Sequence, residues 1–184
     1  MDLFAYSQIE NLESYLKNNN IEIARLRGLR LMKDEETVNK KDISEIIKEA
    51  KVDYLVNWLQ QHDDYCWSSD KADKKHKAFI YGINEYGKKE VVDYDFSKVH
   101  GKDRKHIKYR WKKIEKAYTT QYDLFNEYVG QNVLYVHSRI GGGNRSYYPE
   151  AWQKIKNHPL YLGDCDDAFD STYCDIYFKI KNVN

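Results

Sequence analysis

Apolar residues repeat at helical spacing in three parts of the N-terminal third of the chain. The first repeat follows a Ser-x-x-Glu capping pattern at Ser7 and stops at the asparagines 18–20. A second helix is expected within residues 21–36, where arginines alternate with leucines. The third follows another capping pattern at Asp42 and runs to about His62. The pattern therefore predicts a small helical unit.

The hydropathy period changes from helical to two after a polar stretch at residues 63–77. The segments 78–83 and 88–94 alternate and flank a short connection, residues 84–87. Gly87 lies where such a connection requires a positive φ. These features predict a β-hairpin.

The longest helical pattern covers residues 101–129, and two alternating segments follow it. Residues 132–140 and 172–180 are expected to be strands, the second ending the chain's regular structure. These elements should bury the following residues: Ile107, Trp111, Ile114, Leu134, Val136, Cys174, Ile176 and Phe178.

The predicted elements place the chain in the α+β class. N-terminal helices should precede a small antiparallel or mixed sheet of about four strands, packed on the long amphipathic helix. A helical unit at residues 1–62 and an α+β unit at residues 78–184 are separated by only a soft boundary. A single domain remains an alternative.

Composition limits where a function can reside. Apolar residues make up 41% of the 184 residues and charged residues 32%, and the net charge is +1, so any electrostatic function needs a local patch. No apolar run is long enough to span a membrane, and the first ten residues lack the features of a signal peptide. Three cysteines are too few for a disulfide framework. We therefore expect a cytoplasmic protein with reduced thiols and no membrane partner.

A basic stripe is expected on the helix at residues 101–129. If Trp111 marks its buried side, five lysines fall on the opposite face: Lys102, Lys105, Lys112, Lys113 and Lys116. Such a face can follow a phosphate backbone or an acidic protein surface. The alternative is an ordinary solvated face of an amphipathic helix.

Three consecutive glycines follow the strand at residues 132–140. They can turn several N–H groups toward one anion, and the adjacent arginines can add bidentate contacts. The candidate partner-binding or anion-binding residues of this segment are His137, Arg139, Gly141, Gly142, Gly143, Asn144 and Arg145. The alternative is a structural clasp, in which Arg139 and Arg145 neutralise nearby aspartates. The segment lacks both a Walker A and a dinucleotide-binding pattern.

Four aspartates that Arg139 and Arg145 could neutralise lie close together in the sequence: Asp164, Asp166, Asp167 and Asp170. A cation must offset their repulsion, and it could be a divalent metal, the arginines of the glycine segment or a basic partner. The spacing departs from a calcium loop, and no Cys-x-x-Cys or paired-His pattern supports zinc. We therefore expect neither a metal nor a cofactor, and favour pairing with Arg139 and Arg145.

Residues 133–178 carry two motifs, VHSRIGGGNR and DCDDAFDSTY. They resemble a family of uncharacterised small phage and prophage proteins. In that family His-x-Arg precedes a Gly-Gly-Gly-Asn-Arg loop, and Asp-Asp-x-Phe-Asp-x-Thr-Tyr follows. The matching residues are His137, Arg139, Gly141, Gly142, Gly143, Asn144, Arg145, Asp166, Asp167, Phe169, Asp170, Thr172 and Tyr173. The resemblance implies a phage protein but no reaction.

A phage protein without a catalytic pattern is expected to act by binding. The leading hypothesis is a non-catalytic, anti-CRISPR-like inhibitor of a bacterial defence system. It would work in the host cytoplasm on a defence protein or its nucleic acid. The alternative is a nucleotide-binding protein or phosphohydrolase whose glycine-rich loop holds a phosphate. No catalytic residue is assigned, and the oligomeric state is left open.

Overall fold

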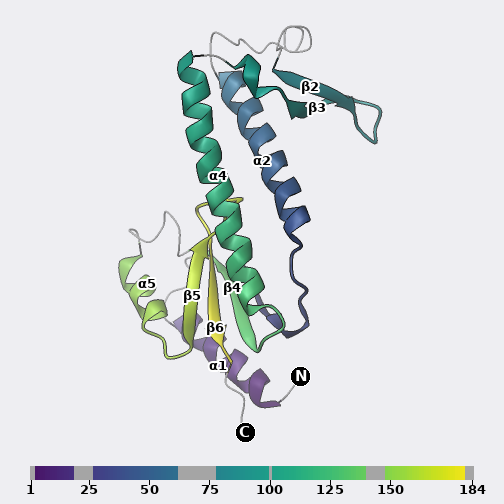
Figure 1. Cartoon of the computed structure of the whole chain (residues 1–184). Coiled ribbons are helices and arrows are strands. Elements are labelled where there is room, and N and C mark those ends of the chain that lie inside the picture. The colour runs from purple at the N-terminus through teal and green to yellow at the C-terminus, as the bar shows by residue number, and fades with distance from the viewer. Residues whose placement is uncertain (1–2, 19–26, 62–77, 100, 140–147, 181–184) are drawn as a thin grey trace. The chain divides into compact units, whose positions relative to one another are not determined.

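The structure is a computed structural model, and it divides the chain into two compact units. It describes residues 3–18, 27–61, 78–99, 101–139 and 148–180 (Figure 1). Unit 1 combines residues 1–38 with residues 119–184, and unit 2 consists of residues 39–118. This division differs from the soft boundary expected between residues 62 and 78, because the N-terminal helix belongs with the C-terminal strands.

Unit 1 is built on a four-stranded antiparallel sheet with the order β1-β4-β6-β5. Its strands are β1 (Arg27–Leu31), β4 (Val133–Ser138), β5 (Tyr161–Asp166) and β6 (Cys174–Lys179). All residues from Cys174 to Phe178 are buried. A central strand buried on both faces needs layers on both sides of the sheet.

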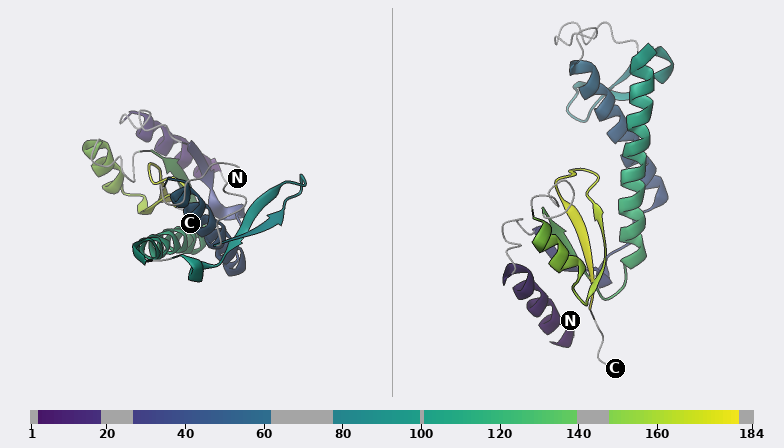
Figure 2. Two further views of the ribbon diagram at one scale, coloured as in Figure 1. Left: turned by 90° about the horizontal axis from the view of Figure 1, so that it is seen from above. Right: turned by 90° about the vertical axis from the view of Figure 1, so that its left-hand side faces the viewer.

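Helices supply those two layers (Figure 2). The helices of the unit are α1 (Leu3–Asn18), α5 (Pro149–Lys156) and the C-terminal part of α4 (Gly101–Tyr128). Leu16 of α1 and Ile155 of α5 pack with Phe178 on one face. Tyr128 of α4 packs against Tyr177 on the opposite face, with ring centroids 5.0 Å apart. None of the described helices is long and apolar enough to cross a membrane.

Strand β1 corrects the prediction of a helix within residues 21–36. Residues 27–31 form the strand, and a short 3-10 helix follows at Met32–Asp34. Leu31 pairs with Leu134 of β4 and packs in the core, whereas Arg30 lies over the ring of Tyr135 at 5.0 Å. Pairing with a buried strand overrides the helical preference of this short segment.

Unit 2 contains two helical segments and a hairpin. These are α2 (Lys40–Gln61), the N-terminal part of α4, and the strands β2 (Phe79–Ile83) and β3 (Lys89–Tyr94). Its core includes Leu55, Phe79, Val99 and Ile107, all buried. Trp111 also packs in this core.

The hairpin has the connection that the sequence predicts. The Asn84 side chain accepts hydrogen bonds from the backbone N–H of Tyr86 and Lys88, at 3.0 and 2.9 Å. Gly87 has a φ of 71°, in the left-handed region that favours glycine. The hairpin forms a two-stranded sheet of its own and is not part of the four-stranded sheet.

The α+β class, the four-stranded sheet and the long helix are confirmed, and α4 continues through Thr119 and Thr120. Several details differ. Helix α1 begins at Leu3, before the expected cap at Ser7. Helix α2 begins at Lys40, and its cap is Asn39, whose side chain accepts the N–H of Lys41 at 2.8 Å. The sequence did not indicate α5 or β5.

Of the eight residues predicted from the sequence to be buried, seven are buried in the structure. Ile107, Trp111 and the five predicted positions of β4 and β6 are buried. Ile114 is only half-buried, although it packs against the core of unit 2.

Candidate functional site

A buried aspartate and a histidine form the centre of the candidate site, within unit 1. His137 of β4 and Asp175 of β6 are paired across the sheet. The His137 Nδ1 atom lies 2.8 Å from Asp175 Oδ1. Asp175 is 2% exposed and is the only buried charged residue in the described part of the chain. A buried carboxylate needs hydrogen-bond donors around it.

Two more side chains satisfy the Asp175 carboxylate. The Tyr135 hydroxyl donates to Oδ1 at 2.7 Å, and the Gln121 side chain of α4 donates to Oδ2 at 3.1 Å. Burial, and then the negative charge of Asp175, raise the pKa of the Tyr135 phenol far above its usual value. Tyr135 therefore stays protonated and acts as a donor. A carboxylate oxygen accepts hydrogen bonds, so this contact is made by the tautomer of His137 that donates from Nδ1 to Asp175.

Asp167 lies on the other side of the imidazole. Its Oδ2 atom is 3.5 Å from Nε2 of His137, and the two side chains are 12% and 20% exposed. The other oxygen, Oδ1, accepts the backbone N–H of Phe169 at 2.7 Å and that of Asp170 at 3.3 Å. These bonds to the loop fix the carboxylate and turn Oδ2 toward the histidine.

The loop between β5 and β6 is held by its own aspartates. Asp170 accepts the backbone N–H and the hydroxyl of Thr172, at 3.0 and 2.7 Å. The backbone of Asp167 pairs with that of Tyr173 at 3.0 Å. Both carboxylates therefore close a compact turn that carries the site residue Asp167.

Gln121 joins the long helix to both halves of the site. While its amide nitrogen donates to Asp175, its amide oxygen accepts the backbone N–H of Ala168 at 2.9 Å. Both hydrogen bonds are formed with the same orientation of the Gln121 side-chain amide. Gln121 thus links the buried carboxylate to the loop.

Aromatic stacking fixes the plane of the imidazole. The Tyr173 ring is stacked on His137, with centroids 4.9 Å apart and planes 9° apart. The Arg139 guanidinium lies over the same tyrosine ring, 5.6 Å from its centroid. The order of groups is therefore guanidinium, phenol, imidazole and buried carboxylate, which leaves His137 little freedom to rotate.

The arrangement can support two kinds of chemistry. A carboxylate that accepts from Nδ1 leaves Nε2 to act on another atom, as in general bases and in metal-bound histidines. Ligand atoms of His137, Asp167 and Asp175 all lie within 4.8 Å of one another, close enough to hold one cation. The His137 side chain is 20% exposed, so solvent reaches the ring.

Part of the expected glycine-segment site falls outside the described residues: Gly141, Gly142, Gly143, Asn144 and Arg145. The clasp between arginines and aspartates therefore stays a prediction, and the described contact of Arg139 is with the Tyr173 ring. The described partner of Asp167 is His137, not an arginine. Asp167 therefore contacts a histidine of the first motif.

The other two members of the acidic cluster lie on β5. Asp164 accepts a hydrogen bond from the Tyr161 hydroxyl, and Asp166 is exposed. Asp164 and Asp166 thus belong to a strand, whereas Asp167 and Asp170 belong to the turn that follows, where backbone N–H groups donate to both carboxylates.

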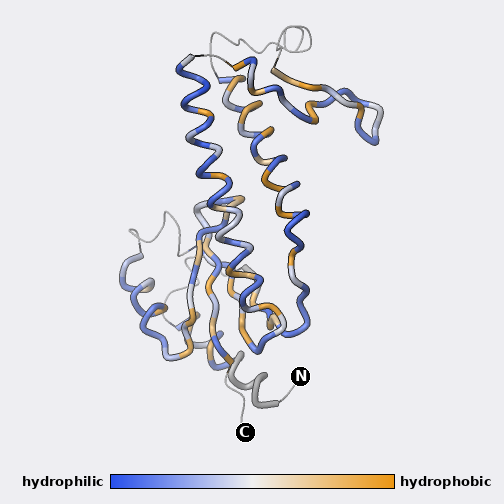
Figure 3. Tube along the Cα trace, viewed as in Figure 1, coloured by the Kyte–Doolittle hydropathy of each residue, from blue (hydrophilic) through white to orange (hydrophobic). Residues whose placement is uncertain are grey.

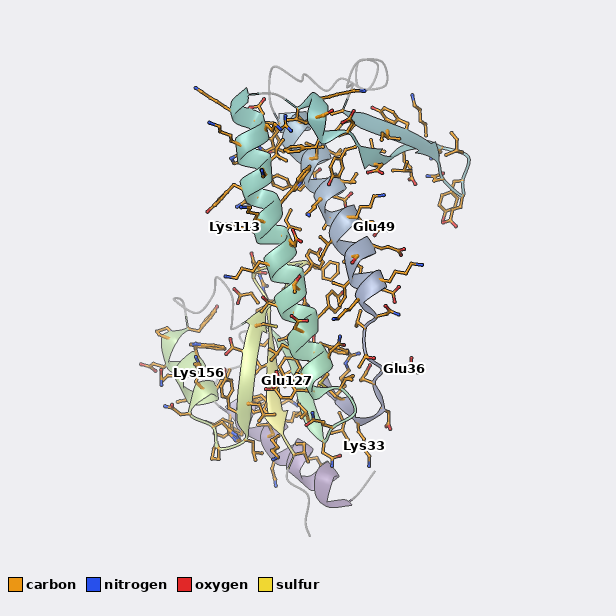
Figure 4. The ribbon with its side chains drawn as sticks, in the orientation of Figure 1. Lys33, Glu36, Glu49, Lys113, Glu127 and Lys156 are labelled. Atoms are coloured by element: carbon orange, nitrogen blue, oxygen red, sulfur yellow. The ribbon has the colours of Figure 1, made fainter. Side chains whose placement is uncertain are left out.

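The basic stripe has the exposure that the helical pattern predicts. All five lysines expected on this side of the helix are exposed: Lys102, Lys105, Lys112, Lys113 and Lys116. Figure 4 shows Lys113 on the side of α4 that faces away from α2. On the opposite side, Trp111 packs against Tyr94 and Phe96, with centroids 4.7 and 4.4 Å away. We call the five lysines the basic face of α4.

Three residues of the site were not predicted from the sequence: Asp175, Tyr135 and Gln121. One of them could have been found. Asp175 is a charged residue between the predicted core positions Cys174 and Ile176, and a charged residue within such a strand is usually paired. Gln121 gave no comparable indication, because a glutamine on a long helix is ordinary.

Comparison with known proteins adds no assignment. No family model matches the chain, and neither a curated protein nor a solved structure matches it.

Proposed function

We propose that this chain is a non-catalytic binding protein that docks the basic face of α4 onto nucleic acid. On the resemblance to phage proteins, its role would be to inhibit a bacterial defence complex that uses that nucleic acid. The observation that carries the proposal is the exposure of all five lysines on one side of one helix.

The charge of α4 is unevenly distributed, which supports a local anion-binding surface. All eight of its Lys and Arg residues lie in residues 101–118, and residues 119–128 contain acids but no basic residue. Figure 3 shows the hydrophilic character of the basic part. A protein with almost no net charge needs such a concentration to attract a polyanion.

An exposed aromatic residue within the basic face favours nucleic acid over an acidic protein. Tyr109 is 57% exposed, and the Lys113 ammonium lies 4.9 Å from its ring centroid. Exposed rings among lysines offer a surface on which bases stack. From Lys102 to Lys116 the helix rises about 21 Å, on the order of six base pairs of a duplex.

A charge-reversal experiment tests the proposal. The test variant changes Lys105, Lys112 and Lys116 to Glu. The control makes the same change of charge at three exposed lysines of unit 1: Lys33, Lys154 and Lys179. Both variants should fold normally, because exposed charges contribute little to stability.

Binding to DNA and RNA oligonucleotides is measured by fluorescence anisotropy at several salt concentrations. The test variant should bind more weakly, and its salt slope should fall by about 0.9 for each phosphate that it no longer neutralises. The control should bind like the parent. Equal affinity and equal slope for both variants would mean that the basic face is only a solvated surface.

A plaque assay tests the inhibitory role. The chain is expressed in bacteria that carry one of a panel of defence systems and are challenged with a phage that each system restricts. We expect plaques to return for at least one system, and to be lost again with the Lys105, Lys112 and Lys116 variant. Rescue by that variant as strong as by the parent would show that inhibition uses another surface.

A second candidate function has its own observation. The His137 side chain is 20% exposed, and Arg139 lies one residue beyond β4. A phosphate bound there would suit a nucleotide-binding protein or a phosphohydrolase. A thermal-shift screen against nucleotides separates this candidate from the first, because a bound nucleotide raises the melting temperature. Release of phosphate would identify a hydrolase.

A further inference from the structure

The two nitrogens of His137 have different surroundings. Nδ1 is 2.8 Å from Asp175 Oδ1, which is a normal hydrogen-bond length, whereas Nε2 is 3.5 Å from Asp167 Oδ2. An N–H···O hydrogen bond is usually shorter than about 3.2 Å. The carboxylate of Asp167 therefore faces Nε2 at a separation too long for a good hydrogen bond.

That longer separation suits a shared metal ion. Histidine nitrogens and carboxylate oxygens bind Zn²⁺ at about 2.1 Å. Two such atoms 3.5 Å apart subtend about 113° at the ion, close to the tetrahedral angle. We propose that His137 Nε2 and Asp167 Oδ2 bind one divalent transition-metal ion, and that Asp175 orients the imidazole through Nδ1.

The surroundings of the pair resemble those of metal-bound histidines. Metal-bound histidines usually donate their second N–H to a carboxylate, and Asp175 accepts it here. Tyr135 and Gln121 hold Asp175 in place, while backbone N–H groups occupy Oδ1 of Asp167 and leave Oδ2 for the ion. The hydrogen bonds at Nδ1 of His137 and at Oδ1 of Asp167 can be kept when an ion binds.

The negative charge of the site is a second reason to expect a bound metal ion. Two carboxylates lie on either side of one imidazole, and one of them is 2% exposed. Negative charge concentrated in a partly buried site is costly unless a cation offsets it. A divalent ion between Nε2 and Oδ2 would supply that charge, and one imidazole with one carboxylate suits zinc, manganese or cobalt.

Two protein ligands leave coordination positions for water or for an oxygen of a bound anion. The His137 and Asp167 side chains are 20% and 12% exposed, so solvent can reach the ion. This site shares no residue with the basic face of α4. Loss of nucleic-acid binding in the lysine variant and loss of metal binding at His137 can therefore be observed separately.

The experiment titrates the metal-stripped full chain with Co²⁺, followed by visible absorption, and with Zn²⁺, followed by calorimetry. We expect one ion per chain and ligand-field bands for Co²⁺. His137→Gln and Asp167→Asn should each abolish this binding. Asp175→Asn should weaken it about 10- to 100-fold, because the imidazole loses its orienting partner.

Two control variants match these changes outside the site. His106→Gln and Asp123→Asn alter an exposed histidine and an exposed aspartate of α4, and both should bind metal like the parent. The controls matter because the chain has six His and three Cys, which can bind metal elsewhere. Far-UV circular dichroism checks that each variant is folded.

An independent readout does not require any variant. Addition of Zn²⁺ should shift the ¹⁵N resonance of His137 Nε2 and leave its Nδ1 proton bonded to Asp175. Absence of one-to-one binding to the parent would overturn the proposal. So would binding that survives both His137→Gln and Asp167→Asn, or an unshifted Nε2 resonance in the zinc-saturated protein.

Discussion

Asp175 of β6 and His137 of β4 are joined by a contact of 2.8 Å between Oδ1 and Nδ1, and Asp175 is buried. This contact links the two sequence motifs of the C-terminal third, because His137 belongs to the first and Asp175 follows closely after the second. The motifs therefore meet around one buried carboxylate.

Replacement of Asp175 by alanine should destabilise unit 1. The change leaves the half-buried Tyr135 hydroxyl and His137 N–H without their acceptor, which should cost about 3 kcal/mol of unfolding free energy. Urea unfolding followed by circular dichroism measures this loss. Asp123→Ala, at an exposed aspartate, is the control. A parent-like midpoint for Asp175→Ala would mean that the hydrogen bonds contribute nothing to stability.

Trp111 should be a main support of unit 2. It is 8% exposed, packs on Tyr94 and Phe96, and donates from Nε1 to the Lys51 carbonyl at 3.3 Å. Trp111→Ala should cost about 3–5 kcal/mol, as for other buried aromatic residues. Urea denaturation checks this value. Lys108→Ala removes an exposed neighbour and should have little effect; equal losses for the two variants would contradict the assignment of Trp111 to the core.

His158 should make stability depend on pH. Burial lowers its pKa below the ordinary 6.5, and its Nδ1 accepts the Leu160 N–H at 3.1 Å, which requires an unprotonated atom. The unfolded chain then binds more protons than the folded chain, so stability falls as pH drops below about 6.5 toward the folded pKa. Denaturation midpoints between pH 7.5 and 5.5 measure the effect.

His158→Asn is the matched variant for this pH dependence. Asparagine keeps an acceptor oxygen near Leu160 but does not titrate. The variant should lose less stability than the parent over the same pH range. Parallel curves for the two proteins would show that other groups cause the dependence.

Substitution of Gly87 tests whether the hairpin turn requires a residue in the left-handed conformation. Its φ is 71°, and an added Cβ would meet nothing within 4 Å, so a side chain costs only backbone energy. Gly87→Ala should therefore lose about 1–2 kcal/mol. Gly87→Asn should lose less, because asparagine adopts the left-handed conformation more readily. Thermal and urea unfolding of the two variants should rank them in this order, and a reversed order would contradict a purely conformational cost.

Arg145 lies outside the described residues, so a variant of this residue is needed to test the clasp hypothesis. Arg145→Ala should lower the urea midpoint if the residue neutralises the aspartates. If it only binds a ligand, the midpoint should be that of the parent and ligand binding should be lost. Measurements with and without nucleotides separate the two outcomes.

Most regular elements could be predicted from local pattern, and the exceptions have physical causes. The long helix and the strand containing His137 have strong periodicity over many residues. Strand β1 has five residues whose leucines and arginines fit either period, so its pairing with β4 decides its structure. Helix α5 has only eight residues, and β5 carries aspartates that resemble a loop.

The sequence by itself determined the α+β class, the exposed lysines of α4 and the residues at which the two C-terminal motifs occur. These features depend on spacing along one element, which sequence records directly. Only the tertiary structure decided which carboxylate His137 contacts. Asp175 lies 38 residues away, and strand register brings it opposite His137. Such a contact depends on pairing between distant segments, and no local pattern specifies that pairing.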